Sequence, residues 1–201
     1  MRADPYPLKQ VMSWERRYII PTFQRDYEWT REDQWELLAD DLEAVAERLR
    51  VERHHAELAG KPAAKADESV SPHFLGAIVL DRLTPLTAGG LDLRSVIDGQ
   101  QRLTTLQYVL TALVHTLRAA KHEKLLPLID ACLTNSNPET MEDESVERFK
   151  LWPTFRDRKQ YEMAMTSGSV DALRERFPAS FTQTGSLRKI GIDHPPALEA
   201  I

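Results

Sequence analysis

The strongest constraint on the fold is a short polar turn that separates a strand pattern from a long helical pattern. Residues 91–97 read Leu-Asp-Leu-Arg-Ser-Val-Ile and fit a short strand, and residues 98–102 read Asp-Gly-Gln-Gln-Arg. Beyond the turn, apolar side chains recur at Leu103, Leu106, Val109, Leu110, Leu113, Val114 and Leu117. Spacings of three and four residues place these side chains on one face of a helix. The pattern therefore predicts a strand, a tight turn and a helix in direct succession.

The turn itself carries residue types that suit an anion site. Backbone N–H groups at a helix N-terminus have no partner within the helix and attract negative charge. Gly99 permits close approach of the backbone, and the Arg102 guanidinium offers a planar fork of donors that matches phosphate oxygens. Gln100 and Gln101 are able to orient a water molecule or read a base. The alternative is a capping box, in which Asp98 and Gln101 cap the helix and Arg102 is only solvated.

A second candidate site lies at residues 20–29, which show neither helical nor alternating periodicity. Three aromatic side chains surround Gln24 and Arg25 there, namely Phe23, Tyr27 and Trp29. Aromatic rings beside an arginine can stack on a base or line an apolar pocket, as they do in loops that bind nucleic acid. The alternative is that the aromatics fasten the loop to the core and that Arg25 caps a helix end.

The remaining patterns predict an α+β fold with a small mixed sheet and several helices. Strands are expected near residues 17–20, 74–80 and 92–97, with the last two paired, and a short extended piece is expected at 149–153. A helix over about 31–57 follows a capping signal at Thr30 and Asp33. Further helices are expected over 124–133, 156–165 and 170–177, the last capped by Ser169.

Composition excludes several classes of protein. With 26 basic and 31 acidic side chains the net charge is -5, so bulk charge does not bind this chain to nucleic acid. A local basic rim is needed instead, with the possible contributors Arg16, Arg17, Arg25, Arg148, Lys150, Arg156, Arg158 and Lys159. The sequence has no glycine-rich phosphate-binding fingerprint, and its six histidines lack metal-ligand spacing. The lone Cys132 and the lack of a signal or membrane-spanning stretch predict a cytoplasmic protein without membrane contact.

Three motifs, in order, resemble the N-terminal domain of the GmrSD family of modification-dependent restriction enzymes. The first is Ile20-Pro21-Thr22-Phe23-Gln24-Arg25-Asp26-Tyr27-Glu28-Trp29, the second is Phe74-Leu75-Gly76-Ala77-Ile78-Val79, and the third is Val96-Ile97-Asp98-Gly99-Gln100-Gln101-Arg102-Leu103-Thr104-Thr105-Leu106. The resemblance covers roughly residues 15–120, and residues 149–153 are a weaker fourth point. The family acts in bacterial phage defence and includes relatives that sense phosphorothioate-modified DNA.

The resemblance implies a fold of the ParB and sulfiredoxin type and a nucleoside triphosphatase that prefers GTP. Carried onto this sequence, it implies catalytic roles for four residues of the turn: Asp98, Gln100, Gln101 and Arg102. It implies nucleotide contacts from Asp98, Gly99, Gln101, Arg102, Thr104 and Arg25. No protein ligands are assigned to a metal, although Mg²⁺ is a possible cofactor of the nucleotide.

The first motif is implied to sense the DNA modification. Its candidate residues are Pro21, Phe23, Gln24, Arg25, Tyr27 and Trp29. The expected partners are the nucleotide, modified double-stranded DNA, and a C-terminal His-Asn-His nuclease domain or partner subunit that cuts the DNA. A reader without catalytic activity, in which the turn binds backbone phosphate, is the rival hypothesis, and a purely regulatory domain is a third.

The expected domain organisation has two parts. Residues 1–122 form the nucleotide-binding and DNA-sensing core, with a flexible loop at 58–72. Residues 123–201 form a mainly helical extension that continues into a nuclease domain, since the tail after residue 192 has no closing signal.

Overall fold

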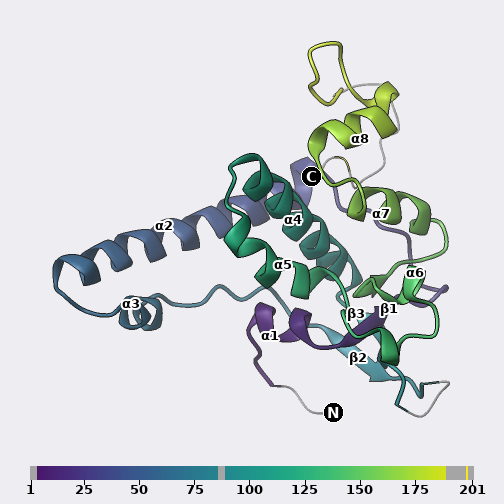
Figure 1. The fold of residues 1–201 in the computed structure, drawn as a ribbon, viewed down its shortest axis with the longest axis horizontal. Coiled ribbons are helices and arrows are strands. Elements are labelled where there is room, and N and C mark those ends of the chain that lie inside the picture. Colours follow the sequence, from purple (N-terminus) through teal and green to yellow (C-terminus); the bar gives the residue numbers. More distant parts are fainter. Residues whose placement is uncertain (1–3, 86–88, 189–197, 199–201) are drawn as a thin grey trace. The chain divides into compact units, whose positions relative to one another are not determined.

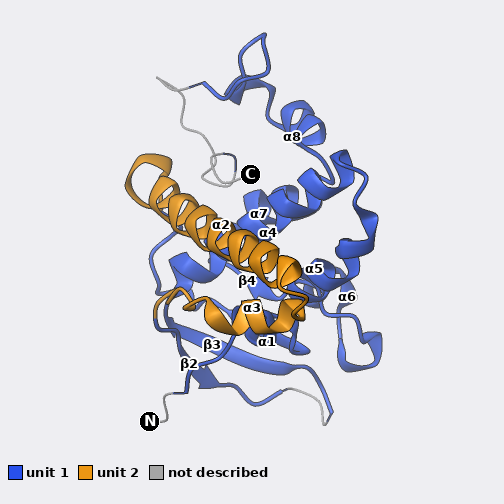
Figure 2. Ribbon diagram, turned by 90° about the vertical axis from the view of Figure 1, so that its left-hand side faces the viewer, with its two compact units in different colours: residues 1–28, 77–201 blue, residues 29–76 orange. Residues whose placement is uncertain are grey.

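The computed structural model describes residues 4–85, 89–188 and 198, and these residues form two compact units. The first unit combines residues 1–28 with residues 77–201, and the second contains residues 29–76 (Figure 2). The tail after residue 192, to which the expected continuation was assigned, lies outside the described residues except for Leu198. Among the described helices, none combines the length and the apolar character that a membrane crossing requires.

The first unit is built on a four-stranded mixed sheet with the strand order β2-β3-β1-β4. The strands are β1 (Arg16–Ile19), β2 (Val79–Arg82), β3 (Asp92–Asp98) and β4 (Leu151–Trp152). β1 pairs in parallel with β3 and with β4, while β2 and β3 are antiparallel. The α+β class, the small mixed sheet and the pairing of the second and third strands are thereby confirmed.

Helices of this unit cover the sheet and provide the core. They are α1 (Leu8–Ser13), α4 (Gln100–Ala119), α5 (Leu126–Leu133), α6 (Glu144–Glu147), α7 (Arg158–Met165) and α8 (Val170–Arg176), with short 3-10 turns at Glu123–Leu125, Pro138–Thr140 and Pro178–Ser180. α4 contacts α5, α7 and β4, and Figure 1 shows it at the centre of this unit. Ser169 accepts a hydrogen bond from the Ala172 N–H, which confirms the predicted cap of α8.

The core of the first unit is aromatic as well as aliphatic. Tyr18, Val96, Leu103 and Tyr161 are at most 1% exposed. The Tyr161 ring packs edge-on against Phe149, with the ring centres 6.0 Å apart. The segment after residue 122 therefore supplies both a strand and core side chains to the sheet that the earlier residues begin.

The predicted strand at 74–80 is wrong over most of its length, because β2 begins only at Val79. Gly76 has a φ of 97°, which an extended strand does not allow, and Phe74 is 80% exposed. The apolar sequence of residues 74–80, Phe-Leu-Gly-Ala-Ile-Val-Leu, is therefore a misleading signal for burial.

The second unit consists of a π-helical turn, η1 (Arg31–Trp35), and the helices α2 (Glu36–Leu58) and α3 (Ala63–Ser69). The predicted long helix is confirmed, but Thr30 does not cap it in the expected way, since its hydroxyl donates to the Asp33 carboxylate at 3.0 Å. The predicted loop at 58–72 is wrong over α3. Arg53 of α2 donates to both carboxylate oxygens of Asp67 in α3, at 2.6 and 2.9 Å.

Candidate functional site

The turn before α4 holds Gly99 in a conformation that only glycine adopts readily. Its φ is 94°, in the left-handed region, and the Leu103 N–H donates to its carbonyl to close the first turn of α4. A Cβ atom at this position would lie 3.2 Å from the Ala77 carbonyl oxygen and 3.2 Å from Cγ1 of Ile78. The chain entering β2 therefore passes directly against the turn.

We expect Gly99→Ala to destabilise the protein by about 2–4 kcal/mol, because a left-handed residue with a side chain costs about 1–3 kcal/mol before the contact with Ala77 is counted. Gly60→Ala is the matched control, since Gly60 has a φ of 64° and no described atom within 4 Å of the position that a Cβ would take. Urea unfolding of both variants measures the difference. Equal losses for the two variants would show that the approach of Ala77 does not matter.

The two glutamines of the turn are buried and bind the loop of residues 20–28. Gln100 and Gln101 are 7% and 5% exposed. Gln100 Nε2 donates to the Arg25 carbonyl at 2.8 Å, and Gln101 Nε2 donates to the Asp26 carbonyl at 2.9 Å. Gln101 Oε1 also accepts from the Glu28 N–H at 2.9 Å. The capping-box alternative is therefore wrong, because the Gln101 side chain does not reach back to its own helix.

Asp98 and Arg102 are the more accessible side chains of the turn. Asp98 is exposed, and its Oδ1 accepts from the Gly99 N–H at 2.8 Å. Arg102 is half-buried and donates through Nη1 to the Ala77 carbonyl. A guanidinium carries five N–H donors, so this bond leaves capacity for an anion. Thr104 differs from these two, since it is 2% exposed and its hydroxyl donates to the Gln100 carbonyl at 2.9 Å.

The loop of residues 20–28 separates buried from exposed aromatics. Tyr27 is 7% exposed, its hydroxyl lies 2.6 Å from Thr105 Oγ1, and its ring packs edge-on against Tyr108 with 5.7 Å between the ring centres. Phe23, by contrast, is 80% exposed. The fastening alternative therefore describes Tyr27, whereas Phe23 offers a bare aromatic surface.

The other candidate residues of the first motif differ in their contacts. Gln24 Nε2 donates to the Ile97 carbonyl at 3.0 Å, which ties the loop to the end of β3. Arg25 forms an exposed ion pair with Glu28 at 3.1 Å, and Pro21 accepts from the Gln24 N–H in a tight turn. Trp29 begins the second unit, so it is not assigned to this cluster.

A third segment, residues 154–157, also fixes the loop of residues 20–28. Thr154 Oγ1 lies 3.0 Å from Asp26 Oδ1 and 2.9 Å from Asp157 Oδ2. Asp157 also accepts from the Tyr27 N–H at 3.0 Å, and Arg156 pairs with Asp26 at 3.1 Å. The sequence indicates only Arg156, as a basic residue, because no local pattern marks a carboxylate that will bind a loop 130 residues away.

Burial raises the pKa of the Asp157 carboxyl above its usual 3.8, and the neighbouring Asp26 charge acts in the same direction. A raised pKa in the folded state means that the stabilisation from this group is complete below the unfolded value and is lost as the pH rises through the folded value. We expect the melting temperature of Asp157→Asn to rise relative to that of the wild type as the pH rises above the usual carboxyl value of 3.8. A difference in melting temperature that stays constant with pH would contradict the raised pKa of Asp157.

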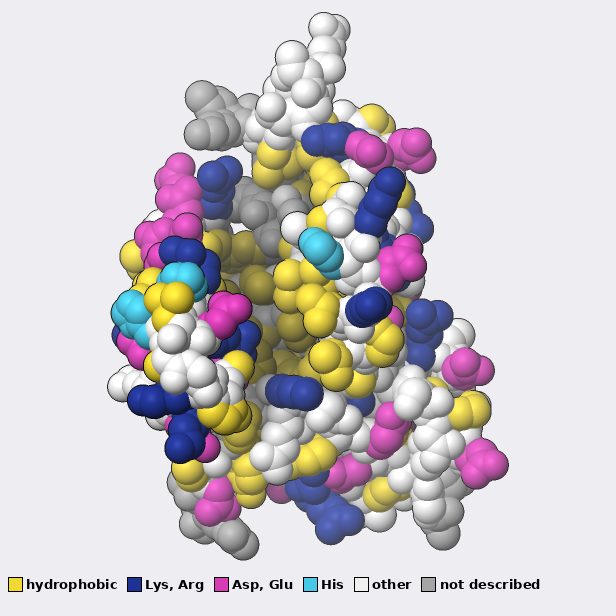
Figure 3. All heavy atoms as spheres, turned by 60° about the vertical axis from the view of Figure 1, so that its left-hand side comes forward, with side chains coloured by type: hydrophobic (Ala, Val, Ile, Leu, Met, Phe, Trp, Pro, Cys, Tyr) yellow, Lys and Arg dark blue, Asp and Glu magenta, His cyan; other side chains and the backbone are white. Residues whose placement is uncertain are grey.

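Several members of the predicted basic rim are not available to a ligand. Lys150 is 0% exposed and donates to the Trp14 carbonyl, and burial lowers its pKa. Arg17 is buried with its guanidinium 4.7 Å from the Trp152 ring centre, and Arg16 is paired with Asp92 at 2.7 Å. On the face drawn in Figure 3, the described Lys and Arg side chains are interspersed with acidic ones. The exposed contributors on this unit include Arg25 and Arg156, which are 64% and 83% exposed.

The arrangement as a whole joins a helix N-terminus, an exposed carboxylate and an arginine to a loop that carries an exposed phenylalanine. Within the described residues, no three His, Cys, Asp or Glu side chains converge to form a metal site.

The sequence of this α+β domain matches a known family of restriction enzymes along most of its length. The sequence model of the family described as "GmrSD restriction endonuclease, N-terminal domain" matches residues 8–188. The chain therefore belongs to this family, and the resemblance drawn from the three motifs is confirmed. Membership in a restriction endonuclease family supports a role in phage defence. No curated protein matches the chain.

Proposed function

We propose that the domain binds and hydrolyses a nucleoside triphosphate, with GTP favoured, at the turn of residues 98–102, and that the loop of residues 20–28 recognises modified double-stranded DNA. The observation that best supports this proposal is the direct hydrogen bonding of the loop backbone to Gln100 and Gln101 of the turn. The turn has residues suited to phosphate binding and the loop has residues suited to nucleic-acid binding, and these hydrogen bonds hold the two segments together.

In this proposal, the chain contributes positioning and charge. The N-terminal amides of α4 and the Arg102 guanidinium hold phosphate oxygens, and Arg25 adds a second cation once it exchanges Glu28 for phosphate. Asp98 would hold a water molecule or a Mg²⁺ ion, and that ion would supply neutralisation of the charge on the phosphates. Water then attacks the γ-phosphorus and the bond to the β-phosphate oxygen breaks, with the developing charge stabilised by the same donors.

For the predicted catalytic role, Gln100 or Gln101 would have to exchange its hydrogen bond with the loop for one with the attacking water. Both carboxamides bind the loop, so neither is turned toward an attacking water in this arrangement. That observation favours a second candidate, a reader in which the turn binds the DNA backbone phosphate without hydrolysis. In both cases the groups that donate to phosphate are the N-terminal amides of α4 and the Arg102 guanidinium.

A phosphate-release assay with GTP and with ATP, each with and without a phosphorothioate-containing duplex, separates the two candidates. Release that rises when the modified duplex is added supports the proposed triphosphatase. Duplex binding without any release supports the reader and contradicts hydrolysis at the turn.

DNA cleavage is assigned to a His-Asn-His nuclease domain or a partner subunit. The chain contains two asparagines, Asn135 and Asn137, and both have structural contacts. Asn135 is 5% exposed, accepts from the Arg16 N–H and donates to the Glu147 carbonyl, while Asn137 caps a 3-10 turn. Neither is available as the asparagine of such a nuclease.

A further inference from the structure

The contacts between the loop of residues 20–28 and the start of α4 are made largely by glutamine side chains. Gln24 donates to the Ile97 carbonyl near the end of β3, and Gln100 donates to the Arg25 carbonyl. Gln101 makes two bonds, since it donates to the Asp26 carbonyl and accepts from the Glu28 N–H. Each of these bonds joins a side chain to a main-chain group, so together they fix the path of the loop backbone.

Gln101 is the most completely bound of these residues. Both ends of its carboxamide have partners in the loop at 2.9 Å, and the residue is 5% exposed. Gln100 is bound at one end only, because its Oε1 is buried without a hydrogen-bond partner. A buried carboxamide that loses its partner is left unsatisfied, so the loop and the turn are expected to move together and not separately.

The position of these glutamines in α4 gives the contact its significance. Gln100 and Gln101 are the first two residues of the helix, directly after Gly99. Their backbone amides belong to the helix end that would face phosphate in the proposed function, while their side chains hold the loop. Any ligand that orders this helix end therefore also orders residues 25–28.

We propose that Gln101, assisted by Gln100, is a positioning residue that couples occupancy of the turn to the position of the loop of residues 20–28. This inference rests on the proposed function, in which the turn binds nucleotide and the loop binds DNA. Nucleotide at the turn holds the loop in place, and the ordered loop binds the modified duplex more tightly. Because such coupling is reciprocal, the duplex also tightens nucleotide binding by the same factor.

The first test needs no ligand and examines the Glu28 amide. Gln101→Met keeps the volume of the side chain and removes both bonds to the loop. We expect hydrogen exchange at Glu28 to accelerate about 5- to 10-fold, the equivalent of one lost hydrogen bond. The matched control is Gln107→Met on the same helix, because Gln107 is 1% exposed but donates to the Cys132 carbonyl and not to the loop. Acceleration in both variants, or in neither, overturns the proposal.

The second test measures the coupling itself by fluorescence anisotropy of a labelled phosphorothioate duplex. A non-hydrolysable GTP analogue is expected to lower the Kd for the duplex at least about 5-fold in the wild type and in Gln107→Met, and to leave it unchanged in Gln101→Met. Coupling that survives in Gln101→Met overturns the proposal. A wild type with triphosphatase activity but without any effect of the analogue on duplex binding also overturns it, while the proposed hydrolysis then stands.

Discussion

Replacing Arg102 by alanine is expected to reduce nucleotide turnover by about 100-fold or more while the domain stays folded. The guanidinium is the strongest cationic donor of the turn, and removal of one preorganised donor to a developing negative charge typically costs about 10²–10³ in kcat. Arg102→Lys should restore little, because an ammonium group does not reproduce the planar fork. Turnover is measured by phosphate release, with circular dichroism as the check on folding.

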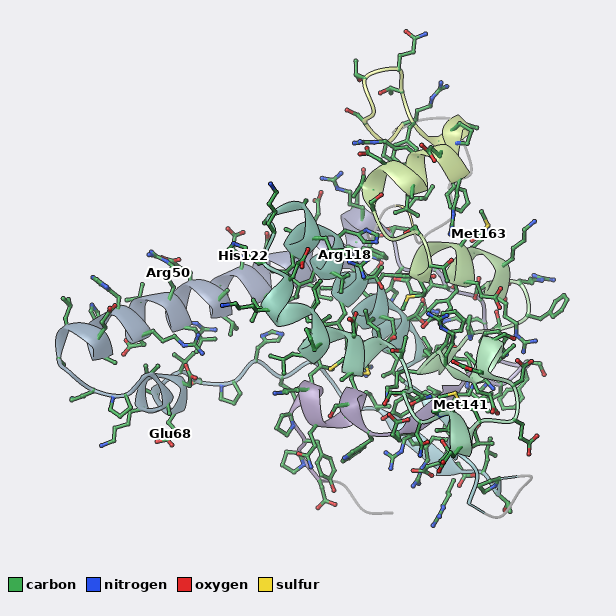
Figure 4. The ribbon with its side chains drawn as sticks, in the orientation of Figure 1. Arg50, Glu68, Arg118, His122, Met141 and Met163 are labelled. Atoms are coloured by element: carbon green, nitrogen blue, oxygen red, sulfur yellow. The ribbon has the colours of Figure 1, made fainter. Side chains whose placement is uncertain are left out.

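Arg118→Ala provides the control for this prediction. Arg118 lies near the C-terminal end of α4, as Figure 4 shows, and it also donates to a backbone carbonyl, that of Gly168. Both variants therefore lose an arginine that binds a main-chain oxygen, but only one lies at the turn. Wild-type turnover in folded Arg102→Ala protein would exclude the turn as the site of hydrolysis.

Tyr27→Ala should have the largest effect on stability, a loss of about 3–5 kcal/mol, as is typical for truncating a buried aromatic side chain. The substitution removes the packing on Tyr108 and the hydrogen bond with Thr105. Phe23→Ala, four residues earlier in the same loop, should change stability by no more than about 0.5 kcal/mol, since its ring is exposed. Denaturant unfolding measures both values.

The same pair of variants distinguishes packing from recognition. Phe23→Ala should weaken binding to modified DNA although the fold is intact, because it removes an exposed ring that is able to stack on a base. A loss of less than about 1 kcal/mol for Tyr27→Ala would contradict the buried position of Tyr27 and return it to the set of direct contacts.

Local sequence pattern is sufficient for the strand, turn and helix around Gly99, because their signals lie within a few residues of one another. It is also sufficient for α2, and for the pairing of β2 with β3. Pattern fails at Gly76, where one positive φ ends the extended chain. For α3 the sequence does carry a signal, since the alanines and charged residues of 63–68 favour a helix. The lack of large apolar side chains in the same segment led instead to the prediction of a loop.

The sequence predicts most residues of the candidate site, but it does not predict the contacts that each of them makes. The sequence assigns Gln100 and Gln101 to a water or a base, yet they bind a loop that lies about 75 positions earlier in the chain. The burial of Tyr27 and the exposure of Phe23 depend in the same way on tertiary contacts. Thr154 and Asp157 give no sequence signal, because a single hydroxyl and a single carboxylate acquire their role only when the fold brings them to Asp26 and Tyr27.

The most direct test of the account is a backbone-amide NMR titration of the protein with a non-hydrolysable GTP analogue in the presence of Mg²⁺. We expect saturable shifts at Gly99, Gln100 and Arg102, accompanied by shifts at Arg25 and Glu28 that follow the same binding curve. Saturable shifts confined to other parts of the chain, with residues 98–102 unmoved, would contradict it.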